Sequence, residues 1–330
     1  MKKLAFCLLP VALAPGLAAQ AAEKPRQLVI ISFDGAHNNA LWEKSLHIAR
    51  KNRAHFTYFL SCAFLMSPAE RAAYKPPHQT RSTSNVGFER DPSKIKIQLA
   101  HIWRAHLDGH DIASHACGHF DGGHWSQADW AQEFASFKQT LMNAYEANGL
   151  ETDKPEGWAH FVDTQIRGFR APYLSVSPGL APALKAAGYT YDASLVSRGP
   201  ALPETQKGVV RFSLPLIPEG PKDRRIIAMD YNLFVRHSKA VETPERSVEF
   251  EQRAYDAFRG EFDRQYSGKR IPLQIGFHFV EMNGGAYWRA LERLTSEVCG
   301  KPDVDCISYA EAVARMKESD AVAGLEKPGL

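Results

Sequence analysis

Long apolar runs are scarce in this sequence. The apolar stretch 4–17 is too short and too interrupted by Pro10, Pro15 and Gly16 for a membrane span, and no other run is long enough, so an integral membrane protein is not expected. No CxxC spacing occurs among the five cysteines, which argues against a zinc cluster of the finger type. An excess of one charge is missing too. The 40 basic residues face 37 acidic ones, and this balance argues against a nucleic-acid partner.

The first residues have the pattern of a secretory signal peptide. Lys2 and Lys3 precede the apolar stretch 4–17, which prolines interrupt, and small residues follow up to Ala21. We expect residues 1–21 to be cleaved and the mature protein to be periplasmic or secreted, without a membrane span. Cleavage leaves 38 basic residues against 37 acidic ones, so the mature chain is close to neutral.

Four cysteines remain after the predicted leader, at positions 62, 117, 299 and 306. An even number in an oxidising compartment favours two disulfides. Cys299 and Cys306 are close enough in sequence to clip a short loop. Cys62 and Cys117 each follow a predicted strand, so a bond between them would join the ends of two neighbouring parallel strands. The alternative is two buried free thiols.

Short β-rich segments alternate with helical patterns along the mature chain, which is typical of a parallel α/β sheet, either open or closed into a barrel. No internal repeat and no Pro- or Gly-rich linker divides it, so we expect a single domain. The expected strands are residues 28–33, 55–60, 111–115, 166–170, 189–191, 225–229, 273–278 and 304–308.

Several helices carry recognisable start and stop signals. Ser126, with an acidic residue three places on, has the pattern of a capping box. Pro178 and Gly188 predict the first turn and the end of another helix. Pro244 predicts the start of a long amphipathic helix with Val248 on its apolar side.

Two segments interrupt this alternation. Residues 67–97 are polar and contain prolines, and we expect a surface insertion that borders the functional site. Residues 319–330 have the composition of a flexible tail. The domain itself is therefore expected to span residues 22–318.

Polar side chains stand at the ends of successive predicted strands. In parallel α/β folds the functional groups gather at the carboxyl ends of the strands. Burial there is costly for such groups unless they are paired or bound to a metal. The residues at these ends are Asp34, His115 and His119, Arg170 with Pro172 and Tyr173, Asp230, and His278.

These residue types suit hydrolysis assisted by a cation. His115 and His119 are four apart, a spacing that on a helical turn lets two imidazoles share a metal. Arg170 is placed to pair with Asp34 and keep it ionised. Asp230 is placed to orient the His278 imidazole and raise its pKa.

The segment RGFRAPYLS is the most specific of these motifs. Pro172 fixes its own φ and has no N–H, so the loop after Arg170 is rigid. The backbone N–H of Tyr173 can then point at a developing oxyanion. Arg170 in a structural salt bridge is the alternative interpretation of this motif.

The order of these motifs resembles the polysaccharide deacetylase family, also called carbohydrate esterase family 4 or the NodB homology domain. The matching segments are SFDG, SHACGH, RAPY, IIAMDY and QIGFHF, and HFTYFLS with GHDIASH is most similar to the chitin deacetylase-like branch. The resemblance covers residues 27–315 and implies a single-domain distorted (β/α) barrel. It also implies a divalent metal, usually zinc, that activates water against an N-acetyl group.

The resemblance also implies a role for each residue. Asp34 would be the general base, with Arg170 as its partner. His278, tuned by Asp230, would be the general acid. The family motifs further imply His115 and His119 as metal ligands and the Tyr173 N–H as oxyanion donor.

Gly35 departs from the family pattern, because the family has a second, metal-binding aspartate at this position. Three alternatives follow from the missing carboxylate. Asp34 itself turns to the metal and leaves the base role to a bound water or another carboxylate, His37 supplies the third ligand, or the site is inactive. A catalytic zinc normally keeps three protein ligands, and two histidines alone would bind it weakly.

The predicted activity is removal of N-acetyl groups from a glycan that contains N-acetylglucosamine, such as chitin oligomers, peptidoglycan or a surface polysaccharide. The alternatives are a non-catalytic glycan-binding protein on the same scaffold, and hydrolysis of a small amide, imide or O-acetyl ester. Trp125 and Tyr173 are candidates for stacking on sugars, with packing the alternative for Trp125. No protein partner is implied.

Overall fold

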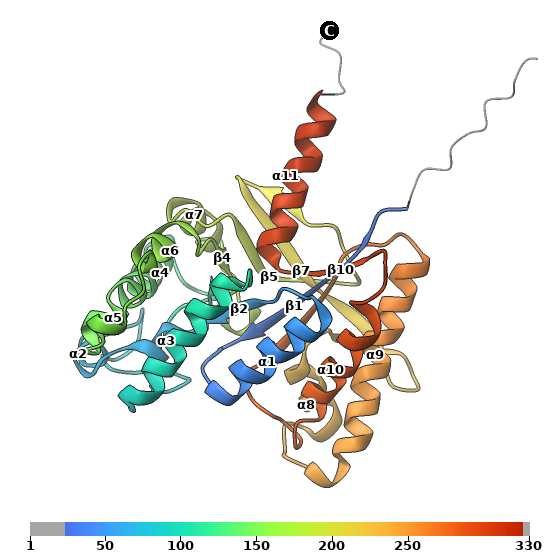
Figure 1. Cartoon of the computed structure of the whole chain (residues 1–330), viewed down its shortest axis with the longest axis horizontal. Helices are drawn as coiled ribbons and strands as arrows, with labels where there is room; N and C mark the ends of the chain where they lie inside the picture. Colours follow the sequence, from blue (N-terminus) through green and yellow to red (C-terminus); the bar gives the residue numbers. More distant parts are fainter. Residues whose placement is uncertain (1–23, 326–330) are drawn as a thin grey trace, which may run out of the picture.

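The computed structural model describes residues 24–325, and the side chains of residues 24–318. The predicted leader 1–21 lies outside the described residues. The last helix, α11 (Tyr309–Leu325), continues into the segment predicted as a tail, and it projects from the body of the molecule in Figure 1. No helix within 24–325 combines the length and the apolar character needed to span a membrane.

A single curled sheet organises the domain. Parallel pairing runs through β1 (Gln27–Asp34), β2 (Thr57–Leu60), β3 (Asp111–Ser114), β4 (Gly168–Phe169), β5 (Tyr191–Ser197) and β7 (Val209–Glu219). Strand β1 also pairs in parallel with β9 (Leu273–His278) and with β10 (Val304–Ile307). The bridge between Met229 and Gly276 links the region after β8 (Arg224–Ile227), which pairs with β7, to β9, which pairs with β1, so the sheet curls round on itself. The distorted barrel predicted from the motifs is confirmed.

Helices cover the outside of this sheet (Figure 1). The apolar run in β1 is buried along nearly its whole length, as expected of a parallel strand with both faces covered. The helices are α1 (Asn39–Asn52), α2 (Pro68–Ala73), α3 (Pro92–Leu107), α4 (Gln127–Met142), α5 (Ala144–Ala147), α6 (Trp158–Thr164), α7 (Leu180–Ala186), α8 (Asp230–Ser238), α9 (Ser247–Ser267) and α10 (Ala286–Val298).

Most local signals in the sequence have the predicted effect. The Ser126 capping box is present at the start of α4. Gly188 follows α7 with a φ of +79°, a left-handed conformation that glycine adopts without steric cost. The prediction that Val248 lies on the apolar side of the helix after Pro244 is wrong. Val248 lies in the first turn of α9, and 77% of it is exposed.

Strand β7 is the longest strand of the structure that was not predicted from the sequence. Pro215 and Pro218 lie within it, and proline weakens a strand assignment because it cannot donate to the ladder. Both are tolerated here. The short strand β6 (Glu204–Gln206) was missed as well.

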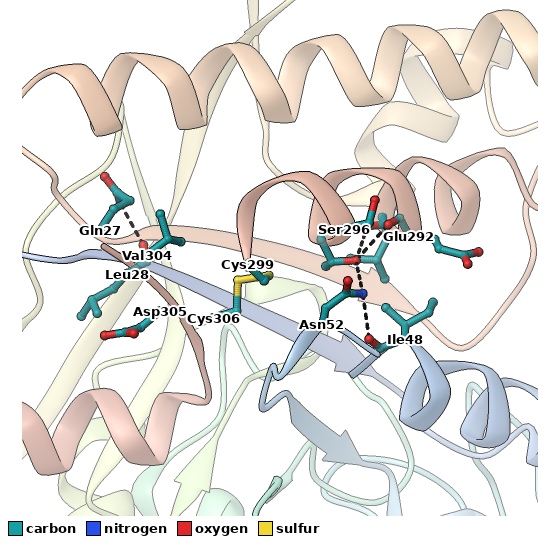
Figure 2. The surroundings of a disulfide bond; sticks show 12 residues. Gln27, Leu28, Ile48, Asn52, Glu292, Ser296, Cys299, Val304, Asp305 and Cys306 are labelled. Atoms are coloured by element: carbon teal, nitrogen blue, oxygen red, sulfur yellow. Dashed lines mark hydrogen bonds between the residues drawn. A yellow bond between two sulfur atoms is a disulfide. The ribbon is translucent and has the colours of Figure 1, made fainter. Parts of the chain in front are cut away.

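Both predicted disulfides are present. Cys299 follows α10 and is bonded to Cys306 in β10, as Figure 2 shows beside Asn52 and Ile48. Cys62, which follows β2, is bonded to Cys117, which follows β3. This second bond lies at the carboxyl ends of two neighbouring strands. Its Cys117 lies between His115 and His119 in sequence.

Candidate active site

Two chemically complementary residues end neighbouring strands. Asp34 is the last residue of β1 and His278 the last residue of β9, and they occupy the same register position of this parallel pair. The Phe279 N–H donates to the Asp34 carbonyl oxygen at 3.3 Å, which ties the two strand ends together. A carboxyl group and an imidazole therefore start from adjacent points at one edge of the sheet.

Asp34 forms a buried ion pair with Arg170. The guanidinium Nη1 donates to Asp34 Oδ1 at 2.7 Å, and the side chain is 0% exposed for Arg170 and 4% exposed for Asp34. Burial alone would raise the pKa of Asp34, but the charge and hydrogen bond of Arg170, together with attraction to His115 and His278, outweigh burial and hold that pKa below its ordinary value. Asp34 is therefore an ionised carboxylate throughout the neutral range.

Arg170 is fixed from all sides. Its Nε donates to the Ala193 carbonyl at 3.0 Å, and its terminal nitrogens donate to Ser32 Oγ at 2.9 Å and Tyr309 Oη at 3.0 Å. The guanidinium also lies over the Phe59 ring at 4.3 Å from its centroid, a cation–π contact. The cation is thereby held in a single position against Asp34.

His278 is paired with a second aspartate. Its Nδ1–H donates to Asp230 Oδ1 at 2.7 Å, and its backbone N–H donates to Oδ2 at 2.9 Å. Asp230 is fully buried at the start of α8, where the helix dipole favours a negative charge. Burial lowers the pKa of His278, but the charge and hydrogen bond of Asp230, together with attraction to Asp34, outweigh burial and raise that pKa above its ordinary value. With 27% of its side chain exposed, His278 can still be reached from solvent.

His115 and His119 lie together in the loop after β3, with ring centroids 4.9 Å apart. His115 donates its Nδ1–H to the Arg170 carbonyl at 2.8 Å, which leaves Nε2 as the free ring nitrogen. His119 Nδ1 is buried and has no hydrogen-bond partner among the described residues. Burial lowers the pKa of both imidazoles, that of His119 to about 3, so both are neutral near pH 7.

Tyr173 lies at the bend predicted from the RAPY motif. It follows Pro172 with a φ of +58°, and its side chain is 59% exposed beside the His119 ring, at 4.8 Å between centroids. Its backbone N–H donates to no acceptor within residues 24–325. The bend is supported by Ser194 Oγ, which accepts from the Ala171 N–H at 2.8 Å. A free N–H on a rigid bend is what an oxyanion donor requires.

The remaining positions singled out in the sequence are His37, Gly35 and Trp125. The Nδ1–H of His37 donates to the Gly35 carbonyl at 2.7 Å, and its ring stacks on Phe64 at 4.1 Å. Gly35 has a φ of +66°, and nothing lies within 4 Å of where a Cβ would stand. Trp125 is 5% exposed and packs against Trp130, so it belongs to the core.

The fit of a divalent metal is incomplete. Two neighbouring imidazoles with free nitrogens suit zinc, and the hydrogen bond from His115 to a backbone carbonyl is the kind that orients metal-binding histidines. Within residues 24–325, however, no group of three or more His, Cys, Asp or Glu side chains is arranged to hold a metal ion. Gly35 adds no carboxylate to these two imidazoles.

Several supporting residues were not identified from the sequence. Ser32, Tyr309 and Ser194 hydrogen-bond to Arg170 or Ala171 from distant parts of the chain, and no local motif marks them. Asp192 accepts from Ser194 and is unmarked as well. Glu133 carries a usable signal, since it is an acidic residue on the apolar face of α4.

Comparison with known proteins gives a fold match and no sequence match. No protein-family model and no curated protein matches the chain. A Mycobacterium smegmatis protein assigned as a polysaccharide deacetylase superposes with a TM-score of 0.56 at 15% identity, over 94% of this chain and 96% of that one. A Pseudomonas aeruginosa protein with the same assignment gives 0.51 at 14%, over 92% and 97%.

The chitin deacetylase of the fungal pathogen Colletotrichum lindemuthianum is more distant, with a TM-score of 0.46 at 14% identity over 85% of each chain. At these identities the likeness establishes the fold alone. The chain has the fold of the polysaccharide deacetylases, as the motif order predicted.

Proposed function

We propose that this chain, which has the polysaccharide deacetylase fold, is a hydrolase that removes N-acetyl groups from a glycan containing N-acetylglucosamine. One observation carries the proposal. An ionised carboxylate and an imidazole of raised pKa, Asp34 and His278, end neighbouring strands at the same register position. Two titratable groups whose pKa values are pushed apart are the pattern of a general base and a general acid.

In this proposal Asp34 accepts a proton from the attacking water, and His278 donates one to the departing amine. Arg170 keeps Asp34 ionised and fixes one of its oxygens, so that Oδ2 remains for the water. Asp230 accepts from both the ring and the backbone of His278, which fixes the ring and stabilises its protonated form. The free N–H of Tyr173 is the proposed donor to the tetrahedral oxyanion.

We further propose that a divalent metal, zinc by the chemistry of its donors, is held by His115 and His119. Asp34 is the preferred third ligand, because Oδ2 accepts no hydrogen bond from the described residues and because its charge raises the pKa of both imidazoles. As a ligand it would leave the base role to a bound water or another carboxylate. His37 is the alternative ligand, and with it Asp34 keeps the base role. When bound, zinc would polarise the acetyl carbonyl and lower the pKa of a bound water. If neither residue supplied the third ligand, the two histidines alone would bind zinc weakly, and dialysis would remove it.

Two disulfides support function in an oxidising compartment, since such bonds are rare in the cytosol. This is consistent with the proposed leader 1–21. A periplasmic or secreted enzyme meets chitin oligomers, peptidoglycan and surface polysaccharides, and these are the proposed substrates.

Acetate release tests the proposed activity. The purified protein is incubated with N-acetylglucosamine oligomers, peptidoglycan or acetylated polysaccharide, with zinc, cobalt or manganese added in turn. We expect release from at least one substrate. Absence of release from every glycan with every metal would contradict the proposal, and saturable binding without turnover would identify a glycan-binding protein.

Metal content tests the ligand assignment separately. The wild type, Asp34→Asn, His37→Ala, His115→Ala and His119→Ala are compared by equilibrium dialysis against zinc, which also detects weakly bound metal. Loss in both histidine variants and in Asp34→Asn supports the preferred set. Loss in His37→Ala with retention in Asp34→Asn would assign the third ligand to His37.

A further inference from the structure

Glu133 is a buried carboxylate that the proposed chemistry does not use. It lies on the inner face of α4 with 0% exposure, between the aromatic residues Trp130 and Phe137. Placing an acidic group in such surroundings is costly unless it accepts hydrogen bonds. Its position is therefore explained by what its oxygens contact.

One oxygen of Glu133 holds the loop that carries the two histidines. Oε1 accepts from the backbone N–H groups of Cys117 and Gly118 at 3.0 and 3.1 Å, and from Tyr74 Oη at 2.7 Å. These two N–H groups lie between His115 and His119 in sequence. Oε2 is buried and has no partner among the described residues.

The loop between the histidines is strained and needs such an anchor. Ala116 and His119 have φ values of +60° and +57°, in the left-handed region that residues with a Cβ seldom adopt. Conformations of this kind persist only where the surroundings fix them. Gly118 cannot be replaced easily, because a Cβ there would lie 2.7 Å from Tyr74 Oη.

The outer side of the loop is held by the segment 67–97. The Asn85 N–H donates to the Gly118 carbonyl at 2.8 Å, and Asn85 Nδ2 donates to the His119 carbonyl at 3.1 Å. Tyr74, which donates to Glu133, belongs to the same segment. Glu133 is thus the inner anchor of a loop that is held from both sides.

We propose that Glu133 is a positioning residue that fixes the His119 ring in the active site by accepting the Cys117 and Gly118 N–H groups. His115 is anchored independently, because its N–H donates to the Leu60 carbonyl at 2.8 Å and its ring to the Arg170 carbonyl. Removal of the carboxylate should therefore displace His119 and leave His115 and His278 in place.

The direct test is the imidazole ¹H–¹³C NMR spectrum of histidine-labelled protein at one pH, with His119 assigned from His119→Gln. Glu133→Ala should shift or broaden the His119 resonance and leave that of His278 unchanged. Glu133→Gln, whose amide oxygen still accepts both N–H groups, should give a near wild-type spectrum. The matched control is Glu261→Ala, a buried glutamate on α9 whose oxygens accept from Arg264 and Gln265.

An unchanged His119 resonance in folded Glu133→Ala would overturn the proposal. If this variant does not fold, Glu133→Asp decides, since it keeps the carboxyl group but withdraws its oxygens from the loop. A His119 shift in Glu133→Asp supports the proposal, and a wild-type spectrum overturns it.

A second readout rests on the proposed function. For acetate release, Glu133→Ala should lower kcat about ten- to hundredfold, the range typical of lost outer partners of functional histidines, with KM nearly unchanged. Glu133→Gln should restore most of kcat, and a kcat as low as that of the alanine variant would count against the proposal. If the wild type releases no acetate, the proposed function fails while the NMR comparison still decides the role of Glu133.

Discussion

Replacement of Arg170 by methionine probes the buried ion pair at the centre of the site. Methionine has a similar length but no charge, so Asp34 is left buried without its counter-charge. Breaking a buried ion pair by removing one partner costs about 3–5 kcal/mol of unfolding free energy. The pair is 0% and 4% exposed, and Arg170 also donates to Ala193, so we expect a loss in this range at pH 7.

The pH dependence of this loss identifies its cause. In the wild type the pKa of Asp34 is lowered, so the pair stabilises the fold above the unfolded pKa and the stabilisation fades as pH falls through the folded value. In Arg170→Met, burial without a cation raises the pKa of Asp34. The folded variant then takes up a proton as pH falls from 7 towards 5, and its stability deficit narrows.

Urea denaturation followed by tryptophan fluorescence and circular dichroism at pH 7 and pH 5 measures both effects. Arg26→Met is the control, because Arg26 pairs with Asp305 at the surface, and its midpoint should stay close to wild type. Asp34→Asn combined with Arg170→Met should lose less than the two single changes added together. A deficit under about 1 kcal/mol, or one that widens on acidification, would refute the argument for a stabilised, ionised Asp34.

Three further predictions concern the rest of the site. Asp230→Asn removes the charge that raises the pKa of His278, so the alkaline limb of the pH profile of kcat/KM should move to lower pH, and an unmoved limb would contradict the pairing. Gly35→Asp should bind zinc more tightly than Gly35→Ala in a chelator competition, and equal affinities would show that the carboxylate does not reach the metal. Both variants should lose about 1–2 kcal/mol of unfolding free energy, because the φ of residue 35 is +66°. Replacing Cys62 and Cys117 by alanine opens a 55-residue loop and should lower the unfolding free energy, measured by urea denaturation, by about 4 kcal/mol. Replacing Cys299 and Cys306, which close a seven-residue loop, should lower it by about 2 kcal/mol. A smaller loss for the longer loop would contradict the estimate.

The strand-end residues were predictable because strand ends have local signals. An apolar run that stops at a polar residue marks the edge of a parallel sheet, which is how Asp34 and His278 were found. The predicted contacts of Asp34 with Arg170 and of Asp230 with His278 are both present in the structure. Their catalytic roles remain predictions.

What the sequence did not reveal depends on packing between distant segments. Tyr309 reaches Arg170 across 139 positions, and Glu133 reaches Tyr74 across 59. No local pattern encodes either contact. For β7 the local pattern points the wrong way. Pro215 and Pro218 argue against a strand, but pairing with β5 and β8 forms the strand nonetheless.

The central claim is that Asp34 and His278 act as base and acid in amide hydrolysis. The most direct measurement is the kcat for acetate release from an N-acetylglucosamine oligomer, compared between the wild type, Asp34→Asn and His278→Ala, each shown to be folded by circular dichroism. General acid–base groups contribute about 10²–10⁴-fold, so each variant should lose at least about 100-fold. Wild-type rates in folded His278→Ala or Asp34→Asn would contradict the claim.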